Sequence, residues 1–176
     1  LAVIDAMYDA NTIDVVTTRH EGGASFMAVA DAKMTGKPGV VLVSRGPGAT
    51  NGSIGIHVSQ QDAVPVIMFV GQVAREDLGR NAFQELDYTK TFSDMAKWVV
   101  EITEADKVAE DVRRAFTIAQ SGVPGPVIVS LPEDMLIDQT KALPLSPATI
   151  SQPKPDSEDI IKVCDMLSQS ERPLII

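Results

Sequence analysis

Short runs rich in Val and Ile alternate along this chain with longer stretches of helical character, an order that few folds accommodate. Within each run the apolar residues are continuous, which is typical of strands buried on both faces of a parallel sheet. The expected strands are residues 14–18, 40–44, 66–70, 98–102 and 127–131. The expected helices are residues 1–10, 21–35, 49–60, 106–121 and 157–168. We therefore predict an α/β, doubly wound domain with a mainly parallel sheet and helices on both faces.

The C-terminal part of the chain has a different composition. A cluster of prolines marks it, at Pro144, Pro147, Pro153 and Pro155. With few large apolar residues between 140 and 156, this stretch is expected to be an extended linker. Residues 157–176 predict an amphipathic helix and a buried strand starting at Leu174. We interpret them as the truncated start of a second α/β domain, after a first domain at 1–139 whose own front is truncated. A C-terminal hairpin packed on the first domain is the alternative.

The composition argues against several classes of function. The chain has 176 residues, a net charge of -9 and no cluster of Lys or Arg, so binding to nucleic acid is not expected. Two histidines and one cysteine, Cys164, are too few for a zinc site or an internal disulfide. A lone thiol fits a reducing compartment. Because no apolar run approaches the ~20 residues that span a bilayer, we expect a cytoplasmic protein without a membrane partner.

The first candidate for chemistry is Glu21, in the run Arg19-His20-Glu21-Gly22-Gly23-Ala24 after the first expected strand. In an open parallel sheet, ligands bind beyond the carboxyl ends of the strands. Two adjacent glycines allow a ligand or another backbone to approach closely, which favours a functional Glu21. The alternative is an ordinary acidic residue in the first turn of a helix, and chemistry alone leaves the two interpretations equal.

The second candidate is the turn Gly46-Pro47-Gly48, which follows one expected strand and precedes a helix. Such a turn can cradle a phosphate with its backbone N–H groups. However, its glycine spacing is one residue longer than the dinucleotide fingerprint, and Pro47 lacks an N–H. Gly71-Gln72 also stands where that fingerprint requires an acid for the ribose. A nicotinamide or flavin site in this domain is therefore disfavoured, and a tight turn without a ligand is the alternative.

A long polar loop after the third expected strand carries Phe83 and Gln84. Loops at the carboxyl edge of a sheet often carry function, whereas the simpler alternative is a solvated connection with Phe83 in the core. His57 lies in the middle of an expected helix. We interpret it as structural, because no Ser-His-Asp or Cys-His order accompanies it.

Seven short motifs, taken in order, resemble those of one family. They are Arg-His-Glu-x-Gly-Ala, Thr-Gly-Lys-Pro-Gly-Val, Gly-Pro-Gly-Ala-Thr-Asn, Val-Gly-Gln-Val, Phe-Gln-Glu, Gly-x-Pro-Gly-Pro-Val and Leu-Pro-Glu-Asp. The set resembles the N-terminal pyrimidine-binding domain of thiamine-diphosphate-dependent enzymes of the acetolactate synthase and pyruvate oxidase group. The similarity covers about residues 14 to 138. Each motif alone is weak, but their common order is specific.

The resemblance implies that two domains hold the cofactor, usually from different subunits. This domain takes the aminopyrimidine ring of thiamine diphosphate, and a C-terminal diphosphate-binding domain of a neighbouring subunit holds the diphosphate through Mg²⁺. Glu21 matches the family's catalytic glutamate, whose carboxyl group hydrogen-bonds to N1′ of the ring. Burial at an apolar interface is expected to raise the pKa of Glu21, so that it shares a proton with N1′.

Other site residues also follow from the resemblance. Gly46, Pro47, Gly48 and Asn51 are expected at the pyrimidine pocket, so the glycine-rich turn is not expected to cradle the diphosphate. Gln84 matches a glutamine that faces the reacting carbon, and Phe83 is expected to line the same substrate pocket. No metal ligand is expected in this part of the protein.

The implied activity is acetolactate synthase-like: decarboxylation of a small 2-oxo acid followed by carboligation, in a homodimer or tetramer. The fragment alone is not expected to catalyse. Synthase, decarboxylase, oxidase and acetyltransferase activities stay open, as does the use of FAD by a central domain. Arg45, His57 and Gln60-Gln61-Asp62 depart from the plain synthases, and Glu21 argues against glyoxylate carboligase, which lacks this acid.

The alternative from another class is a free-standing domain that binds a partner without chemistry. Dimerisation is a further expectation, because the resemblance implies that the helices flanking the cofactor pack against a neighbouring subunit. The helices at 21–35 and 49–60 are rich in small and apolar residues, and such surfaces left uncovered are unusually large for a monomer.

Overall fold

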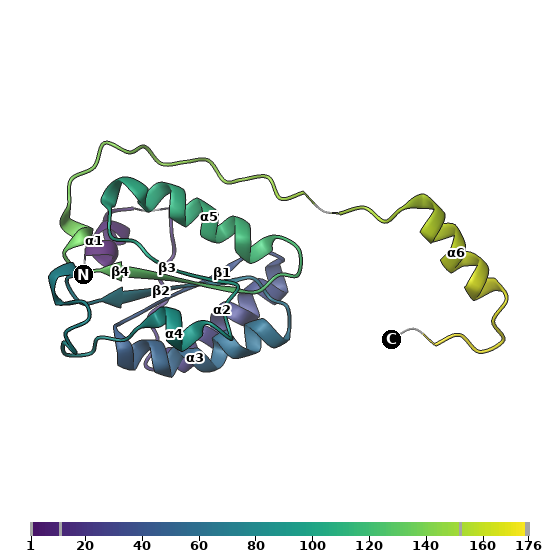
Figure 1. Ribbon diagram of the computed structural model, residues 1–176, viewed down its shortest axis with the longest axis horizontal. Helices are drawn as coiled ribbons and strands as arrows, with labels where there is room; N and C mark the ends of the chain where they lie inside the picture. The colour runs from purple at the N-terminus through teal and green to yellow at the C-terminus, as the bar shows by residue number, and fades with distance from the viewer. Residues whose placement is uncertain (1, 11, 152, 175–176) are drawn as a thin grey trace.

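The computed structural model describes residues 2–10, 12–151 and 153–174, and its centre is a four-stranded, all-parallel sheet (Figure 1). The strands lie side by side in the order β1 (Gly39–Val43), β2 (Val66–Gln72), β4 (Pro126–Pro132) and β3 (Trp98–Glu101). One row of paired residues crosses the whole sheet, through Val41, Met68, Ile128 and Val99. All seven positions of β4 are buried, which confirms that strands with continuous apolar runs are covered on both faces.

Helices cover both faces of this sheet, which confirms the doubly wound arrangement (Figure 1). One face carries α2 (Glu21–Thr35), α3 (Gly46–Gln61) and the short α4 (Tyr88–Phe92), and the other carries α5 (Val108–Gln120) and α1 (Ala2–Asp9). Successive residues of a strand reach opposite cores. In β4, Ile128 packs beneath α2 and α3, whereas Val127 and Val129 pack beneath α5.

Small residues allow α2 and α3 to pack closely against each other. A Cβ atom on Gly55 of α3 would lie 2.4 Å from Ser25 Oγ of α2, so only glycine admits this approach. At the other end of α2, Gly36 takes the left-handed conformation that stops the helix, with a φ of 68°. This close packing holds the first turn of α2 beside the first turns of α3, where the candidate site lies.

The prediction of a strand at residues 14–18 is wrong. In the structure this segment is irregular, and Val15 and Val16 are 55% and 68% exposed. A groove of about 650 Å³ separates it from β1. A strand needs a neighbour ~4.8 Å away to satisfy its backbone N–H and C=O groups, and a β-branched composition does not supply one.

Several helix boundaries also differ from the predictions. α3 begins at Gly46 instead of residue 49, so the glycine-rich turn is the first turn of the helix. α5 begins at Val108, after a short 3₁₀ turn at Ala105–Lys107. α4 was not expected at all. Its five residues are too few for a periodic pattern, and its main signal is the carboxylate of Asp87, which accepts a hydrogen bond from the N–H of Lys90 at 3.1 Å.

The C-terminal part lies apart from the sheet (Figure 1). Residues 140–151 and 153–156 form neither helix nor strand, and α6 (Ser157–Ser168) follows them. The apolar side of α6 is exposed, at Ile160, Ile161, Val163, Met166 and Leu167. The division into a first domain, a linker and the start of a second domain stays a prediction. Residue 1 of the first expected helix and residues 175–176 of the expected last strand lie outside the described residues.

Candidate functional site

The candidate site lies where β1 and β2 end and α3 begins. Parallel strands end at the same edge of a sheet, and open α/β sheets bind their ligands at that edge. Glu21, in the first turn of α2, reaches the first turns of α3, and the loop after β2 brings Gln84 to the other side of the same helix end. The structure thus gathers residues that lie far apart in the sequence.

The side chain of Glu21, on α2, is bonded to a residue of α3. The Nδ2 of Asn51 donates a hydrogen bond to Glu21 Oε2 at 3.1 Å. The other carboxylate oxygen of Glu21, Oε1, lies 3.5 Å from the position that a Cβ atom on Gly48 would take. The preceding His20 caps α2, because its Nδ1 accepts a hydrogen bond from the N–H of Gly22 at 3.0 Å. Because Gly48 has no Cβ atom at that position, it leaves room beside the carboxylate of Glu21.

The pKa of Glu21 lies below its ordinary value of 4.5, which is the opposite of the expected shift. The main cause is a hydrogen bond from its own backbone N–H, followed by that from the Asn51 amide, and both stabilise the charged form. Desolvation raises the pKa, but by less. The prediction assumed burial beneath an apolar partner surface, whereas the carboxylate is only partly buried in this chain.

The first turn of α3 faces the loop that carries Gln84. The N–H of Gly46 donates a hydrogen bond to the carbonyl oxygen of Gln84 at 3.0 Å. A Cβ atom on Gly46 would lie 2.9 Å from that oxygen, so a larger residue would push the loop away. Pro47 follows in the first turn, where no intrahelical N–H donor is required. Because Gly46 already donates to Gln84, its N–H is not directed at a phosphate.

The loop between β2 and α4 places its candidate residues in different settings. Gln84 is partly buried and has a φ of 66°, in the left-handed region that residues other than glycine rarely adopt. Phe83 is 81% exposed, so the alternative that places it in the core is excluded. An exposed Phe at the edge of the site offers an apolar surface to a substrate or to another chain.

A polar cluster that was not predicted from the sequence lies at the carboxyl edge of the sheet, next to the loop that carries Gln84. Gln72, only 2% exposed, donates from Nε2 to the carbonyl of Leu86 at 2.9 Å and to Glu101 Oε2 at 3.1 Å. The hydroxyl of Ser130 donates to the same Glu101 oxygen at 3.2 Å. These bonds tie the ends of β2, β3 and β4 to the loop. No sequence pattern pairs these residues, since they come from separate strands.

The ends of the strands are also bonded to side chains at the starts of α3 and α4. Tyr88 donates from its hydroxyl to the carbonyl of Gly71 at 2.8 Å, and burial, with the charge of Glu101, raises the pKa of Tyr88 to about 12. Arg45, noted above only as a departure from a family pattern, forms an ion pair with Glu133 at the end of β4. Its guanidinium therefore links the start of α3 to the end of β4, at the carboxyl edge of the sheet.

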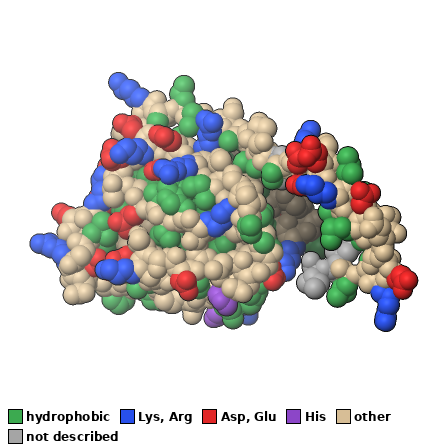
Figure 2. Space-filling view, turned by 45° about the vertical axis from the view of Figure 1, so that its right-hand side comes forward, with side chains coloured by type: hydrophobic (Ala, Val, Ile, Leu, Met, Phe, Trp, Pro, Cys, Tyr) green, Lys and Arg blue, Asp and Glu red, His purple; other side chains and the backbone are tan. Residues whose placement is uncertain are grey.

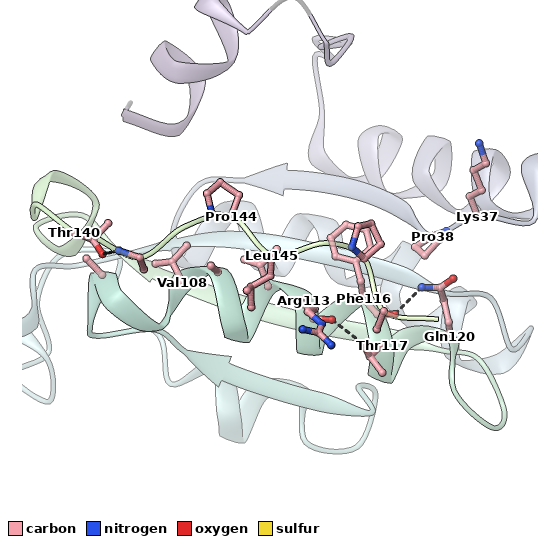
Figure 3. A pocket seen from close by; sticks show the side chains of 16 residues that line it. Lys37, Pro38, Val108, Arg113, Phe116, Thr117, Gln120, Thr140, Pro144 and Leu145 are labelled. Carbon is pink, nitrogen blue, oxygen red and sulfur yellow. Dashed lines mark hydrogen bonds between the residues drawn. The ribbon is translucent and has the colours of Figure 1, made fainter. Parts of the chain in front are cut away.

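Two grooves stand out on the described surface, and only one of them contains candidate residues. The groove of about 650 Å³ is lined by Glu21, by the irregular segment before α2 and by β1. A larger, mainly apolar groove of about 890 Å³ lies between α5 and the proline-rich extension, where Pro144 and Leu145 face Val108 and Phe116 (Figure 3). The larger groove contains none of the predicted site residues, so the candidate site is the one at Glu21.

Other predicted features can be placed on the described residues. His57 is exposed on α3, so it is not a packed residue in this chain. Across the described ranges, no three His, Cys, Asp or Glu side chains gather as ligands for a metal ion. None of the helices described is long and apolar enough to cross a bilayer. On the face of the molecule shown in Figure 2, acidic and basic side chains are interspersed rather than gathered by sign.

Comparison with known proteins gives consistent matches. Residues 1–91 match the family described as "Thiamine pyrophosphate enzyme, N-terminal TPP binding domain". The acetolactate synthase catalytic subunit, mitochondrial, of Saccharomyces cerevisiae is 41% identical over 135 residues, which cover 77% of this chain and 20% of that protein. The acetolactate synthase isozyme 3 large subunit of Escherichia coli is 38% identical over 151 residues, covering 86% of this chain and 26% of that protein.

A third relative covers the whole chain. The acetolactate synthase large subunit of Lactococcus lactis is 34% identical over 182 residues, which cover 100% of this chain and 31% of that protein. The chain thus spans between 20% and 31% of the length of these three curated relatives.

Proposed function

This chain belongs to the thiamine pyrophosphate enzyme family, as its N-terminal TPP binding domain, and from this premise we propose that it forms the aminopyrimidine-binding half of an acetolactate synthase-like active site. The proposed reaction is decarboxylation of a small 2-oxo acid followed by carboligation. The observation that carries the proposal is the carboxylate of Glu21, fixed by the Asn51 amide beside Gly48.

The chemistry of these residues fits an aminopyrimidine ring. A carboxyl group can hydrogen-bond to N1′ of the ring, and Asn51 orients that carboxyl group through one oxygen, leaving the other directed at the space beside Gly48. When bound, thiamine diphosphate supplies the electron sink for decarboxylation of the 2-oxo acid. Glu21 holds and returns a proton at N1′, while Gly46, Pro47 and Gly48 shape the wall of the pocket.

The protonation state of Glu21 follows from its surroundings. The hydrogen bonds that lower its pKa stabilise the carboxylate, which makes Glu21 a weaker proton acceptor in this chain alone. Covering the site with an apolar partner surface would remove water from the carboxylate and raise its pKa. In the assembled site that shift would favour sharing of one proton between Glu21 and N1′.

Gln84 and Phe83 lie on the substrate side of the proposed site. Gln84 is held against the start of α3 through its backbone, so its side chain can be directed at the reacting carbon. The exposed ring of Phe83 supplies an apolar wall for the small 2-oxo acid.

The rest of the site belongs to other parts of the assembly. We propose that a C-terminal domain of a neighbouring subunit holds the diphosphate through Mg²⁺, in a homodimer or tetramer, and that this chain alone is inactive. Binding of FAD in a central domain stays open, and a cytoplasmic location is our proposal for the assembled enzyme. The exposed Phe83 and the exposed apolar residues of α2 and α3 are surfaces that such a neighbour would cover.

The test uses the enzyme expressed from its complete gene. Pyruvate consumption is measured with thiamine diphosphate and Mg²⁺ for the wild type, for Glu21→Gln, and for Glu110→Gln as a control on the exposed first turn of α5. Loss of the proton relay should lower kcat by on the order of 10²- to 10⁴-fold in Glu21→Gln, whereas the control keeps wild-type turnover.

Each other outcome has a definite meaning. Turnover unaffected by Glu21→Gln would remove Glu21 from the mechanism. If none of the proteins consumes pyruvate with the cofactor, other 2-oxo acids and acyl donors are tested in its place, and failure of all of them contradicts the proposed function.

A further inference from the structure

The loop that carries Gln84 contains three residues in the left-handed backbone conformation. Within it, Gly79, Asn81 and Gln84 have φ values of 77°, 54° and 66°. Asn81 and Gln84 have side chains, so these left-handed conformations are unfavourable unless the surroundings hold them. Some contact within or beside the loop must therefore supply that restraint.

The carboxylate of Glu85 supplies it from inside the loop. Its Oε1 accepts a hydrogen bond from the N–H of Gly79 at 2.5 Å, and its Oε2 accepts one from the N–H of Ala82 at 3.0 Å. A backbone bond from the N–H of Glu85 to the carbonyl of Ala82, at 3.0 Å, closes the same turn. The hydrogen bond from Gly79, followed by that from Ala82, holds the pKa of Glu85 below its ordinary range.

The restrained turn lies directly next to the substrate side of the candidate site. Gln84 precedes Glu85, and its carbonyl accepts the hydrogen bond from Gly46 at the start of α3. On the other side, the carbonyl of Leu86 accepts from the buried amide of Gln72 at 2.9 Å. Glu85 thus fixes the outer part of a loop whose inner part is docked on the site.

We propose that Glu85 is a positioning residue, whose carboxylate sets the backbone of residues 79–85 so that Gln84 and Phe83 face the 2-oxo acid. This role rests on the proposed function. Glu85 acts through Gln84 and makes no contact with the substrate itself. The role depends on two acceptor oxygens, because each oxygen receives a different backbone N–H.

Replacement by glutamine isolates that requirement. Glu85→Gln keeps the length of the side chain but replaces one acceptor oxygen by an NH₂ donor, which would face a second donor in the loop. Glu85→Asp keeps both acceptors on a side chain one methylene shorter, so it reaches fewer of the N–H groups. We therefore expect the loop to be best ordered in the wild type, less ordered in Glu85→Asp and least ordered in Glu85→Gln.

The experiment compares these two variants with Glu76→Gln, a matched control at an exposed position earlier in the same connection. All are prepared as the enzyme expressed from its complete gene. The measurements are kcat and KM for the 2-oxo acid, the Kd for thiamine diphosphate with Mg²⁺, and the rate of trypsin cleavage after the exposed Arg80. Cleavage after Arg80 reports loop order independently of activity.

In Glu85→Gln, kcat/KM should fall by on the order of 10²-fold, because small misplacements of a residue that faces the substrate have effects of this size. The Kd for thiamine diphosphate should stay within about threefold of the wild type, because Glu21 and Asn51 are untouched. Cleavage after Arg80 should accelerate. Glu85→Asp should fall between Gln and the wild type, and it carries the test if Glu85→Gln does not fold.

The proposal is overturned if kcat/KM of both Glu85 variants matches the wild type, or if cofactor affinity falls in parallel with kcat/KM. Faster cleavage with unchanged kinetics also overturns it, since Glu85 would then be structural only. A wild type without cofactor-dependent turnover of any 2-oxo acid instead overturns the proposed function, and with it the role of Gln84.

Discussion

α5 and the α2–α3 pair cover opposite faces of one sheet, but their outer surfaces differ. The large apolar residues of α5 are all at least partly buried, at Val108, Val112, Phe116 and Ile118. On α2 and α3, in contrast, Phe26, Met27, Met34 and Ile54 are between 43% and 86% exposed. The large apolar residues of α5 are partly covered by the sheet and by the proline-rich extension, whereas α2 and α3 also have large apolar residues that are exposed.

This difference indicates which face of the sheet is suited to contact another protein surface. α5 lies between its own sheet and the proline-rich extension that crosses it, with the groove of about 890 Å³ between helix and extension (Figure 3). The α2–α3 pair contains the small residues that bring Glu21 and Asn51 together, and it leaves apolar groups facing outward beside that site. Exposed apolar patches on a soluble protein typically mark an interaction surface. The candidate site at Glu21 and the exposed apolar residues of α2 and α3 therefore lie on the same face of the sheet.

The largest expected effect tests whether the core is packed equally well on the two faces of the sheet. Ile128 packs beneath α2 and α3 and Ile67 beneath α5, and both are 0% exposed. We expect Ile128→Ala and Ile67→Ala each to lower the free energy of unfolding by about 3 kcal/mol, through lost burial and a cavity. Urea denaturation measures both. A much smaller loss at Ile128 would mean that the α2–α3 side is loosely packed, and the comparison would then concern the core as well.

The next effect tests the outer surfaces. We expect the chain to self-associate, and Phe26→Asp to weaken association by about tenfold, because a charge replaces an apolar contact at the interface. Arg113→Asp places the same carboxylate on the exposed side of α5, with a larger change in net charge, and should leave association unchanged. Sedimentation equilibrium distinguishes the two variants. A wild-type chain that stays monomeric at high concentration would contradict the inferred interface.

The smallest effect concerns the charge of Glu21. Its folded pKa is depressed, so its charged form stabilises the folded chain above the unfolded pKa, and this stabilisation is lost as the pH falls through the folded pKa. The free energy of unfolding of the wild type should therefore approach that of Glu21→Gln as the pH falls from the ordinary pKa of 4.5 through the lower folded pKa. Denaturation curves of both proteins at several pH values measure this. A difference independent of pH would show that the folded chain does not stabilise the charged form of Glu21.

Much of the fold was predictable because it depends on local composition. The Val- and Ile-rich runs at 40–44, 66–70, 98–102 and 127–131 all become strands, and the helix over Glu21–Thr35 has the predicted bounds. The run at 14–18 has the same composition but no paired neighbour among the described residues, so it stays irregular. At the start of α3, glycines predicted a turn, whereas the first turn of a helix tolerates them and Pro47 because its N–H groups need no intrahelical acceptors.

The candidate site divides in the same way. The family motifs singled out Glu21, Asn51 and Gln84, and the structure brings each of them to the start of α3. The sequence analysis predicted a raised pKa at Glu21, whereas the pKa is lowered in this chain, and the sequence did not indicate how Glu85 closes its loop. Both depend on which N–H groups point at a carboxylate, and that depends on helix and loop geometry rather than on residue type.

The sequence by itself therefore determined four of the five expected strands, the main helices and the candidate site residues, because hydrophobic runs and motifs are local properties. Only the tertiary structure decided which of those residues meet. Asn51 reaches Glu21 across 30 positions, and Gly46 reaches Gln84 from another loop, because parallel strands end at one edge and glycine lets the backbones approach. Hydrogen bonds act over about 3 Å, so their partners are set by packing in space, which separation along a chain does not specify.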